Sequence, residues 1–394
     1  MFETLEAQPQ DPILALMVQY RQDTHPQKVD LGVGVYKDEQ GDTPIMDAVK
    51  QAEALRAQNE NTKSYLSPAG APGFNSAITE LLLGADHSAI ADNRVYTAQA
   101  PGGCGALRMA AEFIKVSNPD CNVWISDPTW ANHEALIGGA GLAIKRYPYY
   151  DPQTHGVDFD SMMEALEQAA PGDAVLLHGC CHNPSGADLN EEQWQVVASL
   201  CQRKGLLPFI DIAYQGLGRG LDEDAFGVRL MAAQLPEVMV ASSCSKNFGL
   251  YRERTGAVMV IGADAEQGRI AFTQLLSIIR SNYSMPPAHG AAIVEIILGD
   301  ATLRANWEAE LAEMRERIQQ LRGDLVKQLA NRGHDFSFIE AERGMFSFLG
   351  ITLEQVRKLR SEHHLYIVDS SRVNIAGLSS SNLERVVGVI DDVL

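Results

Sequence analysis

The amino-acid sequence predicts an α/β protein: a large domain with a mostly parallel sheet flanked by helices, and a smaller α+β domain. From about Asn93 to Ala263, helical patterns alternate with short, continuous apolar runs. Such runs are typical of strands buried on both faces of a parallel or mixed sheet. After Asp300 the pattern changes to a long amphipathic stretch followed by short segments. The chain has 394 residues, more than one hydrophobic core usually serves, so two domains, or one large domain with an appendage, are expected.

The composition narrows the class of protein. With 45% hydrophobic and 21% charged residues, the chain resembles an ordinary soluble globular protein. Its net charge of -19 disfavours nucleic acid and anionic membranes as partners. Six cysteines without a CxxC pair do not indicate a disulfide framework. Because residues 1–12 lack a signal region and no apolar run approaches the roughly 20 residues that span a bilayer, we expect a cytoplasmic protein.

The apolar runs and the amphipathic segments define the expected elements in chain order. Strands are expected at residues 122–126, 173–179, 206–213, 237–243 and 256–262. One long helix is expected over residues 301–332. Short strands should follow at residues 336–340, 344–350, 365–368 and 372–377, with helices at 353–364 and 382–394. The isolated strand-like segment 28–38 is expected to join this last group.

A small domain built from both chain ends follows from this pattern. We expect an N-terminal arm, a small domain in two parts and a large domain between them. Their boundaries are 1–11 for the arm, 12–43 and 313–394 for the small domain, and 44–312 for the large domain.

Polar residues gather where the expected strands of the large domain end. In an open α/β sheet, ligands bind beyond the carboxyl ends of the strands. The segments at these ends are residues 101–105, 127–130, 182–186, 211–214 and 242–247. Together they supply a glycine turn, an indole, an amide, a carboxylate, a phenol, serines and a lysine. Their convergence predicts a ligand site.

The glycine turn at residues 101–105 runs directly into a helical pattern at residues 106–115. Backbone N–H groups at such a helix start bind phosphate readily. The dinucleotide spacing GxGxxG fails, because Arg108 stands where the last glycine is needed. A tight turn without a ligand remains the alternative for this loop taken alone.

Lys246 follows an apolar strand and a serine-rich turn. A lysine in this position loses its proton more easily than a surface lysine and is suited to attack an aldehyde. The hydroxyls of Ser243 and Ser245, with Arg254, are suited to complete a phosphate cage. The alternative is a solvated loop lysine, which is the fate of most lysines.

Asp211 closes an apolar run and is expected to be buried, so its carboxylate needs a partner. A protonated pyridine nitrogen is such a partner, and the carboxylate keeps that ring an electron sink. Arg280 and Arg372 lie beside apolar segments, where their forks suit two substrate carboxylates. The alternatives are a turn-capping aspartate and exposed, ion-paired arginines.

The run His178-Gly179-Cys180-Cys181-His182 contains metal-ligand residue types. Alternation along a strand sends its first members to opposite faces, and two adjacent cysteines chelate one zinc ion poorly. We therefore expect buried core residues here and no metal.

Nine segments resemble the class I aminotransferases, and more narrowly the aspartate and aromatic amino-acid aminotransferases. They are LGVGVYKDE, GGCGALR, SDPTWANH, LLHGCCHNPSGADL, FIDIAYQG, ASSCSKNFGLYRERTGA, IRSNYSMPPAHG, GMFSFLG and SRVNIAG. The likeness keeps motif order and spacing through essentially the whole chain. It implies the fold type I of pyridoxal-phosphate-dependent transferases, pyridoxal 5'-phosphate as cofactor, and a homodimer with shared active sites.

The resemblance also implies roles for single residues around the cofactor. Lys246 matches the lysine that carries the cofactor and moves the substrate proton. Asp211, with His133 behind it, matches the partner of the pyridine nitrogen. The residues that would contact the rest of the cofactor are Tyr214 and Asn183 at the phenolic oxygen, Trp130 stacked on the ring, and Gly103, Cys104, Ser243, Ser245, Arg254 and the neighbouring subunit's equivalent of Tyr65 at the phosphate. Lys246, Asp211, Tyr214 and Trp130 are thus the expected catalytic residues.

On the substrate side, Arg372 matches the clamp for the α-carboxylate, with Gly34 in the same pocket and Asn183 and Trp130 nearby. Arg280 matches the arginine that crosses the dimer interface to hold the side-chain carboxylate.

Three positions depart from the family pattern. Cys104 stands where Thr or Ser is usual, which replaces a hydroxyl with a weak thiol donor and predicts slightly weaker cofactor retention. Ser185 replaces a threonine conservatively. Met285 stands where aspartate-preferring relatives commonly carry Asn, and its apolar side chain favours aromatic substrates.

The expected reaction transfers the amino group of aspartate, with phenylalanine or tyrosine as further donors, to 2-oxoglutarate in ping-pong order. An aromatic aminotransferase of broad specificity is the nearest alternative. Lyase or decarboxylase chemistry on the same cofactor is a second, which turnover dependent on an oxo acid would exclude. A non-catalytic regulator that senses ligands with this fold is a third, disfavoured by the absence of a DNA-binding module and by the charge of -19.

Overall fold

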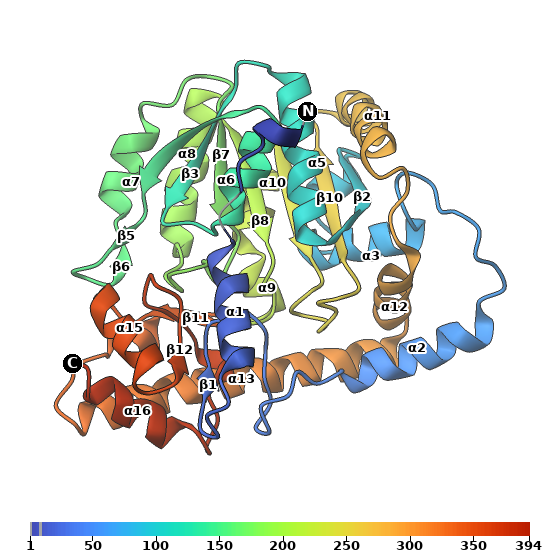
Figure 1. Ribbon diagram of the computed structural model, residues 1–394. Helices are drawn as coiled ribbons and strands as arrows, with labels where there is room; N and C mark the ends of the chain where they lie inside the picture. The colour runs from blue at the N-terminus through green and yellow to red at the C-terminus, as the bar shows by residue number, and fades with distance from the viewer. Residues whose placement is uncertain (1, 8–9) are drawn as a thin grey trace. The chain divides into compact units, whose positions relative to one another are not determined.

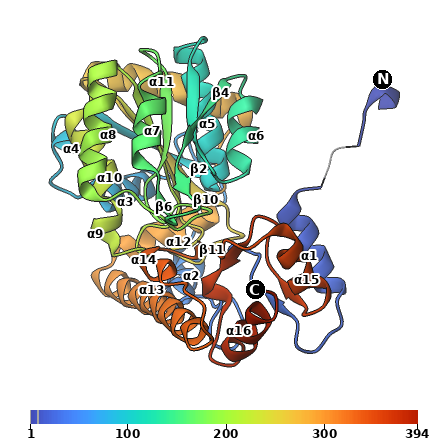
Figure 2. The same cartoon turned by 90° about the vertical axis from the view of Figure 1, so that its left-hand side faces the viewer.

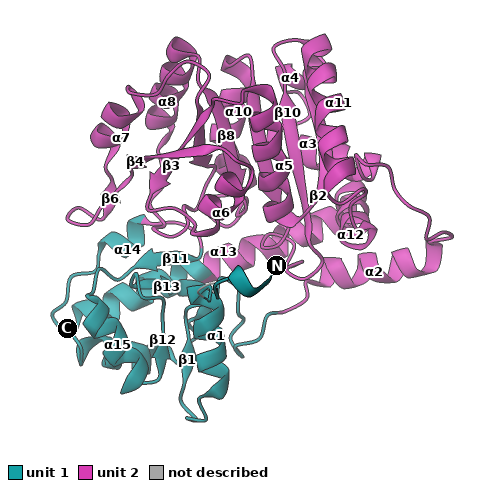
Figure 3. Cartoon of the chain, turned by 45° about the horizontal axis from the view of Figure 1, so that its top comes forward, with its two compact units in different colours: residues 1–43, 318–341, 345–394 teal, residues 44–317, 342–344 magenta. Residues whose placement is uncertain are grey.

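The contacts of the chain divide it into two compact units, shown in Figure 3. The computed structural model describes residues 2–7 and 10–394. The terminal unit comprises residues 1–43, 318–341 and 345–394, and the central unit comprises residues 44–317 and 342–344. The expected arm falls in the terminal unit, with its residues 1, 8 and 9 outside the described residues. The sequence-based boundary follows residue 312, whereas the contacts change at residues 317 and 318, inside helix α13 (Ala301–Ala330).

The central unit is built on a seven-stranded sheet with the order β2-β10-β9-β8-β7-β3-β4. Its strands are β2 (Val95–Pro101), β3 (Asn122–Asp127), β4 (Ala143–Pro148), β7 (Ala174–His178), β8 (Leu207–Ile212), β9 (Val238–Ser243) and β10 (Thr255–Ile261). Neighbouring strands run parallel except β10, which is antiparallel to both β2 and β9. All five runs expected in this region form strands, and the predicted α/β class is confirmed.

Helices cover both faces of this sheet (Figure 1). The buried cluster on one face combines residues of α5 and α11 with alternate strand residues such as Leu176, Phe209 and Val258. Helices α3, α10 and α12 also contact the sheet but contribute no residue to that cluster, so they cover the other face. The helices of this unit that precede α13 are α2 (Asp47–Asn59), α3 (Pro72–Leu83), α4 (Ser88–Ala91), α5 (Gly102–Ser117), α6 (Asn132–Gly139), α7 (Phe159–Leu166), α8 (Glu191–Lys204), α9 (Leu221–Asp224), α10 (Phe226–Gln234), α11 (Ala265–Asn282) and α12 (Ala288–Gly299).

Local sequence signals explain where several of these helices begin and end. Helix α8 begins with a capping box, in which Asn190 and Gln193 each accept from the other's backbone N–H. It ends at Gly205, whose φ of +65° is the left-handed conformation that glycine adopts without strain. A short hairpin, β5 (Tyr150–Asp151) with β6 (Gly156–Val157), precedes α7. Within the described residues, no helix has the length and apolarity needed to cross a membrane.

The terminal unit joins the two ends of the chain. Strand β1 (Val29–Asp30) pairs in parallel with β12 (Leu365–Tyr366), so the segment 28–38 does join the C-terminal group, although only two of its residues form a strand. Strands β11 (Phe346–Phe348) and β13 (Arg372–Asn374) pair antiparallel. The remaining elements, several of them visible in Figure 2, are η1 (Phe2–Thr4), α1 (Pro12–Gln22), α14 (Phe338–Ala341), α15 (Leu353–Ser361), η2 (Ile375–Gly377) and α16 (Leu383–Asp391).

The strand expected at residues 336–340 is wrong, because this segment contains the helical turn α14. Asp335 accepts the backbone N–H of Ser337 at 2.9 Å and starts the turn. The carbonyl of Ile339 then accepts from the buried guanidinium of Arg322 at 3.1 Å. The apolar residues of this segment suit a strand by composition, but these hydrogen bonds stabilise a turn.

Candidate active site

The register of the central sheet brings the polar strand ends to one edge. Strands β3, β7, β8 and β9 run parallel, so their carboxyl ends share that edge, and β10 begins there because it runs the opposite way. Its first residue, Thr255, lies opposite Pro101 at the end of β2. Lys246, just after β9, and Arg254, just before β10, therefore lie at the same edge although eight positions separate them.

Lys246 is half-buried in the turn after β9. Its Nζ lies 5.0 Å from the centre of the Tyr214 ring. Burial lowers the pKa of Lys246 from its ordinary 10.5, and the charge of Arg254 adds to this, while Asp211 and Cys104 oppose it. A larger fraction of the amine is therefore uncharged near neutral pH than in a surface lysine, and the uncharged amine is the nucleophile.

Asp211 lies next to the last position of β8 and is 8% exposed. Its Oδ2 accepts from Nε2 of His133 at 2.9 Å. Within the part of the chain that the structure describes, His133 is the one hydrogen-bond donor to this carboxylate, so Oδ1 remains open. Burial favours a higher pKa for Asp211, but the hydrogen bond from His133 and the charges of His133 and Lys246 outweigh it and lower that pKa. An ionised carboxylate with one open oxygen results.

Two residues that the sequence interpretation did not assign to the site hold His133 in place. The hydroxyl oxygen of Thr129 lies 2.8 Å from His133 Nδ1 and 3.1 Å from His178 Nε2. Burial lowers the pKa of His178 to about 3, so this ring is neutral. Because Thr129 bonds Nδ1, the other nitrogen of His133 is oriented towards Asp211. The spacing of Thr129 four residues before His133 was the available signal.

Asn183 and Tyr214 extend towards each other from neighbouring strand ends. Both are buried, and Asn183 Nδ2 lies 3.5 Å from Tyr214 Oη. Trp130 follows β3 at the same sheet edge, and its ring centre lies 5.3 Å from that of His133 in an edge-to-face contact. The structure therefore brings together the four side chains expected around a cofactor ring and the lysine expected to carry it.

The start of helix α5 forms a cradle suited to an anion. A Cβ on Gly102, whose φ is +73°, would lie 2.4 Å from Nη2 of Arg254, and a Cβ on Gly103 would lie 3.1 Å from the side chain of Ser243. Only glycine permits the first of these approaches. Arg254 Nη1 lies 3.5 Å from Ser245 Oγ. A guanidinium, two hydroxyls and the N–H groups of a helix start thus surround one space.

Cys104 occupies the third position of α5 and is half-buried. Its Sγ accepts a weak hydrogen bond from Asn132 Nδ2 at 3.6 Å. This places the thiol at the cradle, where the family pattern has a hydroxyl.

Tyr65 and Arg280 do not join this cluster within one chain. Tyr65 is 89% exposed. The exposed Arg280 donates to Ser284 Oγ, and its Nη1 lies 3.5 Å from Met285 Sδ. Both residues are therefore available to a partner.

Gly34 and Arg372 belong to the terminal unit. The buried Arg372 donates from Nη2 to the carbonyl of Gly32 at 2.7 Å, and its guanidinium carbon lies 4.2 Å from the centre of the Phe346 ring. A Cβ on Gly34 would lie 2.8 Å from the same ring. The glycine and the aromatic ring thus frame the guanidinium.

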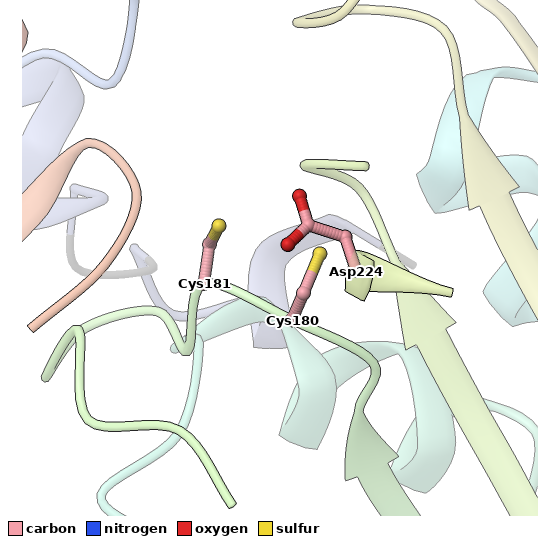
Figure 4. Close-up of side chains that lie close together, drawn as sticks. All are labelled: Cys180, Cys181 and Asp224. Atoms are coloured by element: carbon pink, nitrogen blue, oxygen red, sulfur yellow. The ribbon is translucent and has the colours of Figure 1, made fainter. Parts of the chain in front are cut away.

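The only group of metal-ligand residues found in the described chain is Cys180, Cys181 and Asp224, drawn in Figure 4. The Asp224 carboxylate already accepts three backbone N–H groups, from Gly216, Gly218 and Arg219. A hydrogen bond with Cys181 and burial raise the pKa of Cys180 well above its ordinary 9, which keeps this thiol protonated. The three N–H donors to Asp224 give this group a structural role in holding the loop at residues 216–219.

A cavity of about 580 Å³ lies at the opposite edge of the sheet. Its lining includes Leu207, Val238, Met239 and Ala271, and its charged member is Glu237. This lining contains no lysine, arginine or histidine. The side chains suited to catalysis are therefore those at the carboxyl edge of the sheet.

The chain is similar to known proteins along nearly its whole length. The family profile described as aminotransferase class I and II matches residues 26–390. An aspartate aminotransferase of Salmonella typhi is 51% identical over 396 residues, covering 99% of this chain and 100% of the relative. An aromatic-amino-acid aminotransferase of Paracoccus denitrificans is 47% identical, covering 100% of both chains. The crystal structure of an aromatic-amino-acid aminotransferase from Burkholderia pseudomallei, covalently bound to pyridoxal phosphate, has a TM-score of 0.98 at 47% identity, covering 100% of this chain and 99% of that one. The chain belongs to the class I and II aminotransferases.

Proposed function

We propose that this aminotransferase moves the amino group of aspartate to 2-oxoglutarate, with pyridoxal phosphate held at Lys246. The observation that carries the proposal is that one sheet edge holds both Lys246 and Asp211. Lys246 has a pKa lowered by burial and its Nζ lies 5.0 Å from the Tyr214 ring, and the Asp211 carboxylate is bonded by His133 and keeps Oδ1 open. Relatives with 51% and 47% sequence identity are named for aspartate and for aromatic amino acids. The crystal structure of another relative is described as covalently bound to pyridoxal phosphate.

The residues at the sheet edge fit this cofactor. The cradle of Gly103, Ser243, Ser245 and Arg254 suits a phosphate dianion, because it offers a cation, hydroxyls and helix N–H groups. Cys104 contributes a thiol at the same place. At the other end, the open Oδ1 of Asp211 suits a protonated ring nitrogen.

Asn183, Tyr214 and Trp130 complete the fit around the ring. The amide of Asn183 and the phenol of Tyr214 suit the ring's phenolic oxygen, and the indole of Trp130 offers a flat face. All three come from the same sheet edge as Lys246, so one planar ligand can contact them together.

The proposed mechanism assigns one task to each side chain. When bound, pyridoxal phosphate supplies an aldehyde that joins to amines and a ring that withdraws electrons from the substrate's Cα. The Lys246 amine is freed when the incoming amino acid binds. It removes the Cα proton as general base and then donates a proton as general acid to complete the transfer. The open Oδ1 of Asp211 would accept a hydrogen bond from the protonated ring nitrogen. His133 and Thr129 keep that carboxylate in position. The same steps in reverse accept the second oxo acid.

Substrate recognition is proposed for two arginines. Arg372, framed by Gly34 and Phe346, suits the α-carboxylate because a guanidinium fork binds both oxygens. Arg280 of the partner subunit is proposed to bind the side-chain carboxylate of a dicarboxylic substrate. Closure on the substrate would exclude water from the transfer.

A homodimer with shared active sites is part of the proposal. Tyr65 and Arg280 correspond to residues that serve the neighbouring subunit's site, and both are exposed in the single chain. The apolar side chains of Phe2, Leu5 and Leu14 are 78%, 70% and 60% exposed, which a lone chain rarely tolerates in one segment. An isologous interface would cover them and supply each site with its missing phenol and guanidinium.

Broad specificity for aromatic amino acids is the second candidate, and Met285 favours it. Its thioether lies 3.0 Å from Ser284 Oγ and 3.5 Å from Arg280 Nη1. An apolar, adaptable side chain beside Arg280 suits an aromatic ring as well as a carboxylate.

A half-reaction experiment tests the proposal and separates the two candidates. Aspartate or phenylalanine is added to the holoprotein without any oxo acid, and the visible absorbance of the bound cofactor is followed. If aspartate at low concentration changes the cofactor absorbance and phenylalanine does not, the aspartate preference is supported. Equal concentration dependence for both supports broad specificity, and no conversion by either contradicts amino-group transfer.

A further inference from the structure

Two loops in the central unit carry the side chains proposed to face the phenolic oxygen of the cofactor. The loop after β7 carries Asn183, and the loop after β8 carries Tyr214. Their tips meet, with Asn183 Nδ2 3.5 Å from Tyr214 Oη. This contact is long for a hydrogen bond, and each loop is also held by a buried carboxylate.

Asp188 fixes the first loop. Its Oδ2 accepts the backbone N–H of Cys181, and its Oδ1 accepts that of His182, both at 2.8 Å. These are the two N–H groups directly before Asn183. Cys181 has a φ of +52°, a left-handed conformation that is strained in a residue with a side chain. In this conformation successive N–H groups converge, and a carboxylate is the natural acceptor for them.

Asp224 fixes the second loop in the same way. Its Oδ2 accepts from the N–H groups of Gly216 and Gly218 at 2.8 and 2.9 Å, and its Oδ1 accepts from that of Arg219 at 2.8 Å. Asp224 is 4% exposed. The bonds begin two residues after Tyr214, so they set the direction in which the chain leaves that side chain.

The two anchored loops touch at Gly218. A Cβ there would lie 2.5 Å from Asp224 Oδ1 and 3.1 Å from Cys181 Sγ. Figure 4 shows the side chains of Cys181, Cys180 and Asp224 gathered in one space. Moving either loop therefore moves groups that contact the other.

The charges around these carboxylates make the arrangement sensitive to pH. Burial raises the pKa of Asp188 to about 6, and the charge of Asp224 contributes, while the two backbone N–H groups and Arg219 oppose it. Burial also raises the pKa of Asp224 above its ordinary value, against its three N–H donors and Arg219. Cys180 and Tyr149 are the other titratable groups that face Asp188. Protonation turns one acceptor oxygen into a hydroxyl and weakens one of the bonds that hold its loop.

We infer that Asp188 and Asp224 are positioning residues for the cofactor ring: each anchors the loop that carries one of the two side chains, Asn183 and Tyr214, aimed at the phenolic oxygen. The inference rests on the proposed function for the identity of that oxygen. The anchoring of the loops stands apart from it and is measured separately.

Hydrogen exchange on the full-length protein, with and without added pyridoxal phosphate, tests the anchoring. We expect Asp188→Asn to raise the exchange rate of the amides of Cys181 and His182 at least tenfold, and Asp224→Asn to do so for Gly216, Gly218 and Arg219. Asp173→Asn is the matched control, because Asp173 is also a buried carboxylate that accepts backbone N–H groups, at the other edge of the sheet. Unchanged exchange in both loops would overturn the inference.

The pH profile of the holoenzyme tests the link to the cofactor. The visible absorbance of the bound cofactor is followed as a function of pH. We expect Asp188→Asn and Asp224→Asn to shift the midpoint of this titration by at least half a pH unit and to weaken cofactor binding several-fold. Asp173→Asn should lower thermal stability but leave that midpoint unchanged. Loosened loops with an unchanged midpoint would overturn the positioning role. If the wild-type protein takes up no cofactor, the proposed function fails, while hydrogen exchange still decides the anchoring.

Discussion

Two buried carboxylates at opposite edges of the same sheet differ in what their oxygens accept. Asp173, just before β7, accepts at Oδ1 from the backbone N–H and the side-chain amide of Asn122, and at Oδ2 from the Trp124 indole and the Ala170 N–H, all at 3.0 Å. Asp211, near the end of β8, has one donor, His133, among the described residues. The first carboxylate is saturated by the fold, and the second keeps an oxygen for a ligand.

The pKa of each carboxyl is lowered, so the direction of the shift alone does not separate the two. Burial opposes ionisation of Asp173, but the N–H groups of Trp124, Asn122 and Ala170 outweigh it. For Asp211, burial is outweighed by the hydrogen bond from His133 and by the charges of His133 and Lys246. A buried carboxylate is therefore assigned to chemistry by its open oxygen and its titratable neighbours.

The largest effect is expected for Lys246→Ala. It removes both the attachment point of the cofactor and the general base, so the rate of the half-reaction with aspartate should fall by at least about 10,000-fold. Stopped-flow absorbance of the reconstituted protein measures this. The exposed Lys63→Ala variant is the control and should react at the wild-type rate. A half-reaction within tenfold of wild type would remove Lys246 from the mechanism.

The second test makes the same substitution, Asp to Asn, in the buried carboxylates at both edges of the sheet. Asp211→Asn should lower kcat by roughly 100- to 1,000-fold, because the ring nitrogen loses its anionic partner. Asp173→Asn should keep kcat within about twofold but lower the free energy of unfolding by about 1–3 kcal/mol for each of the two N–H donors that lose the oxygen they share. Steady-state kinetics and urea unfolding of both variants provide the measurements. Equal losses of kcat would break the distinction between the two carboxylates.

The third test compares whether the stability contributed by each carboxyl group rises or falls with pH. Asp211 and Asp173 have lowered pKa values, so each contributes stability above the ordinary 3.8 that is lost as pH falls through its folded pKa. Asp188 has the opposite sign. Its pKa of about 6 means that folding takes up a proton between about pH 4 and pH 6, so its ionisation destabilises the fold as pH rises.

Urea unfolding of Asp188→Asn at several pH values measures that sign. Relative to this variant, the free energy of unfolding of the wild type should fall with rising pH, by up to about 1.4 kcal/mol per pH unit in that interval. A difference that is flat or rises with pH would contradict the raised pKa of Asp188.

The smallest effect is expected at the phosphate cradle. Cys104→Thr should tighten cofactor binding by about two- to tenfold, because a hydroxyl is a better donor to phosphate than a thiol. Equilibrium dialysis of the two proteins against pyridoxal phosphate measures the difference, with Cys104→Ala as the control for loss of the thiol. A Cys104→Thr variant that binds no tighter than the wild type would show that backbone N–H groups alone set the affinity.

Much of the fold could be predicted from local pattern. The five apolar runs between residues 122 and 262 form strands because continuous Val, Leu and Ile are stable only where both faces are buried. The edge strands β2 and β4 were not predicted. Most side chains of β4 are exposed and include Lys145 and Arg146, so its pairing with β3 has no apolar signature. The segment 336–340 was mistaken for a strand because its apolar residues suit one, and the sequence does not show that the distant guanidinium of Arg322 bonds the Ile339 carbonyl.

The candidate site divides in the same way. Lys246, Asp211 and Asn183 were predicted because strand ends meet at one edge and because their motifs resemble a family. Thr129 and His178 were not assigned, since they act by orienting His133, and the one signal for Thr129 was its spacing four residues before that histidine. Asp188 and Asp224 were not predicted either, because their partners are backbone N–H groups, which every residue type except proline carries.

The amino-acid sequence by itself determined the α/β class, the family and the chemical groups available at the sheet edge. These follow from apolar periodicity and from motif order, which are properties of the chain read in one dimension. Only the tertiary structure decided which carboxylate oxygens are filled and which remain open. The physical reason is that the hydrogen bonds of Asp173, Asp188 and Asp224 depend on N–H groups brought close by folding. Asp211 instead meets a histidine from the start of helix α6 and keeps one oxygen open.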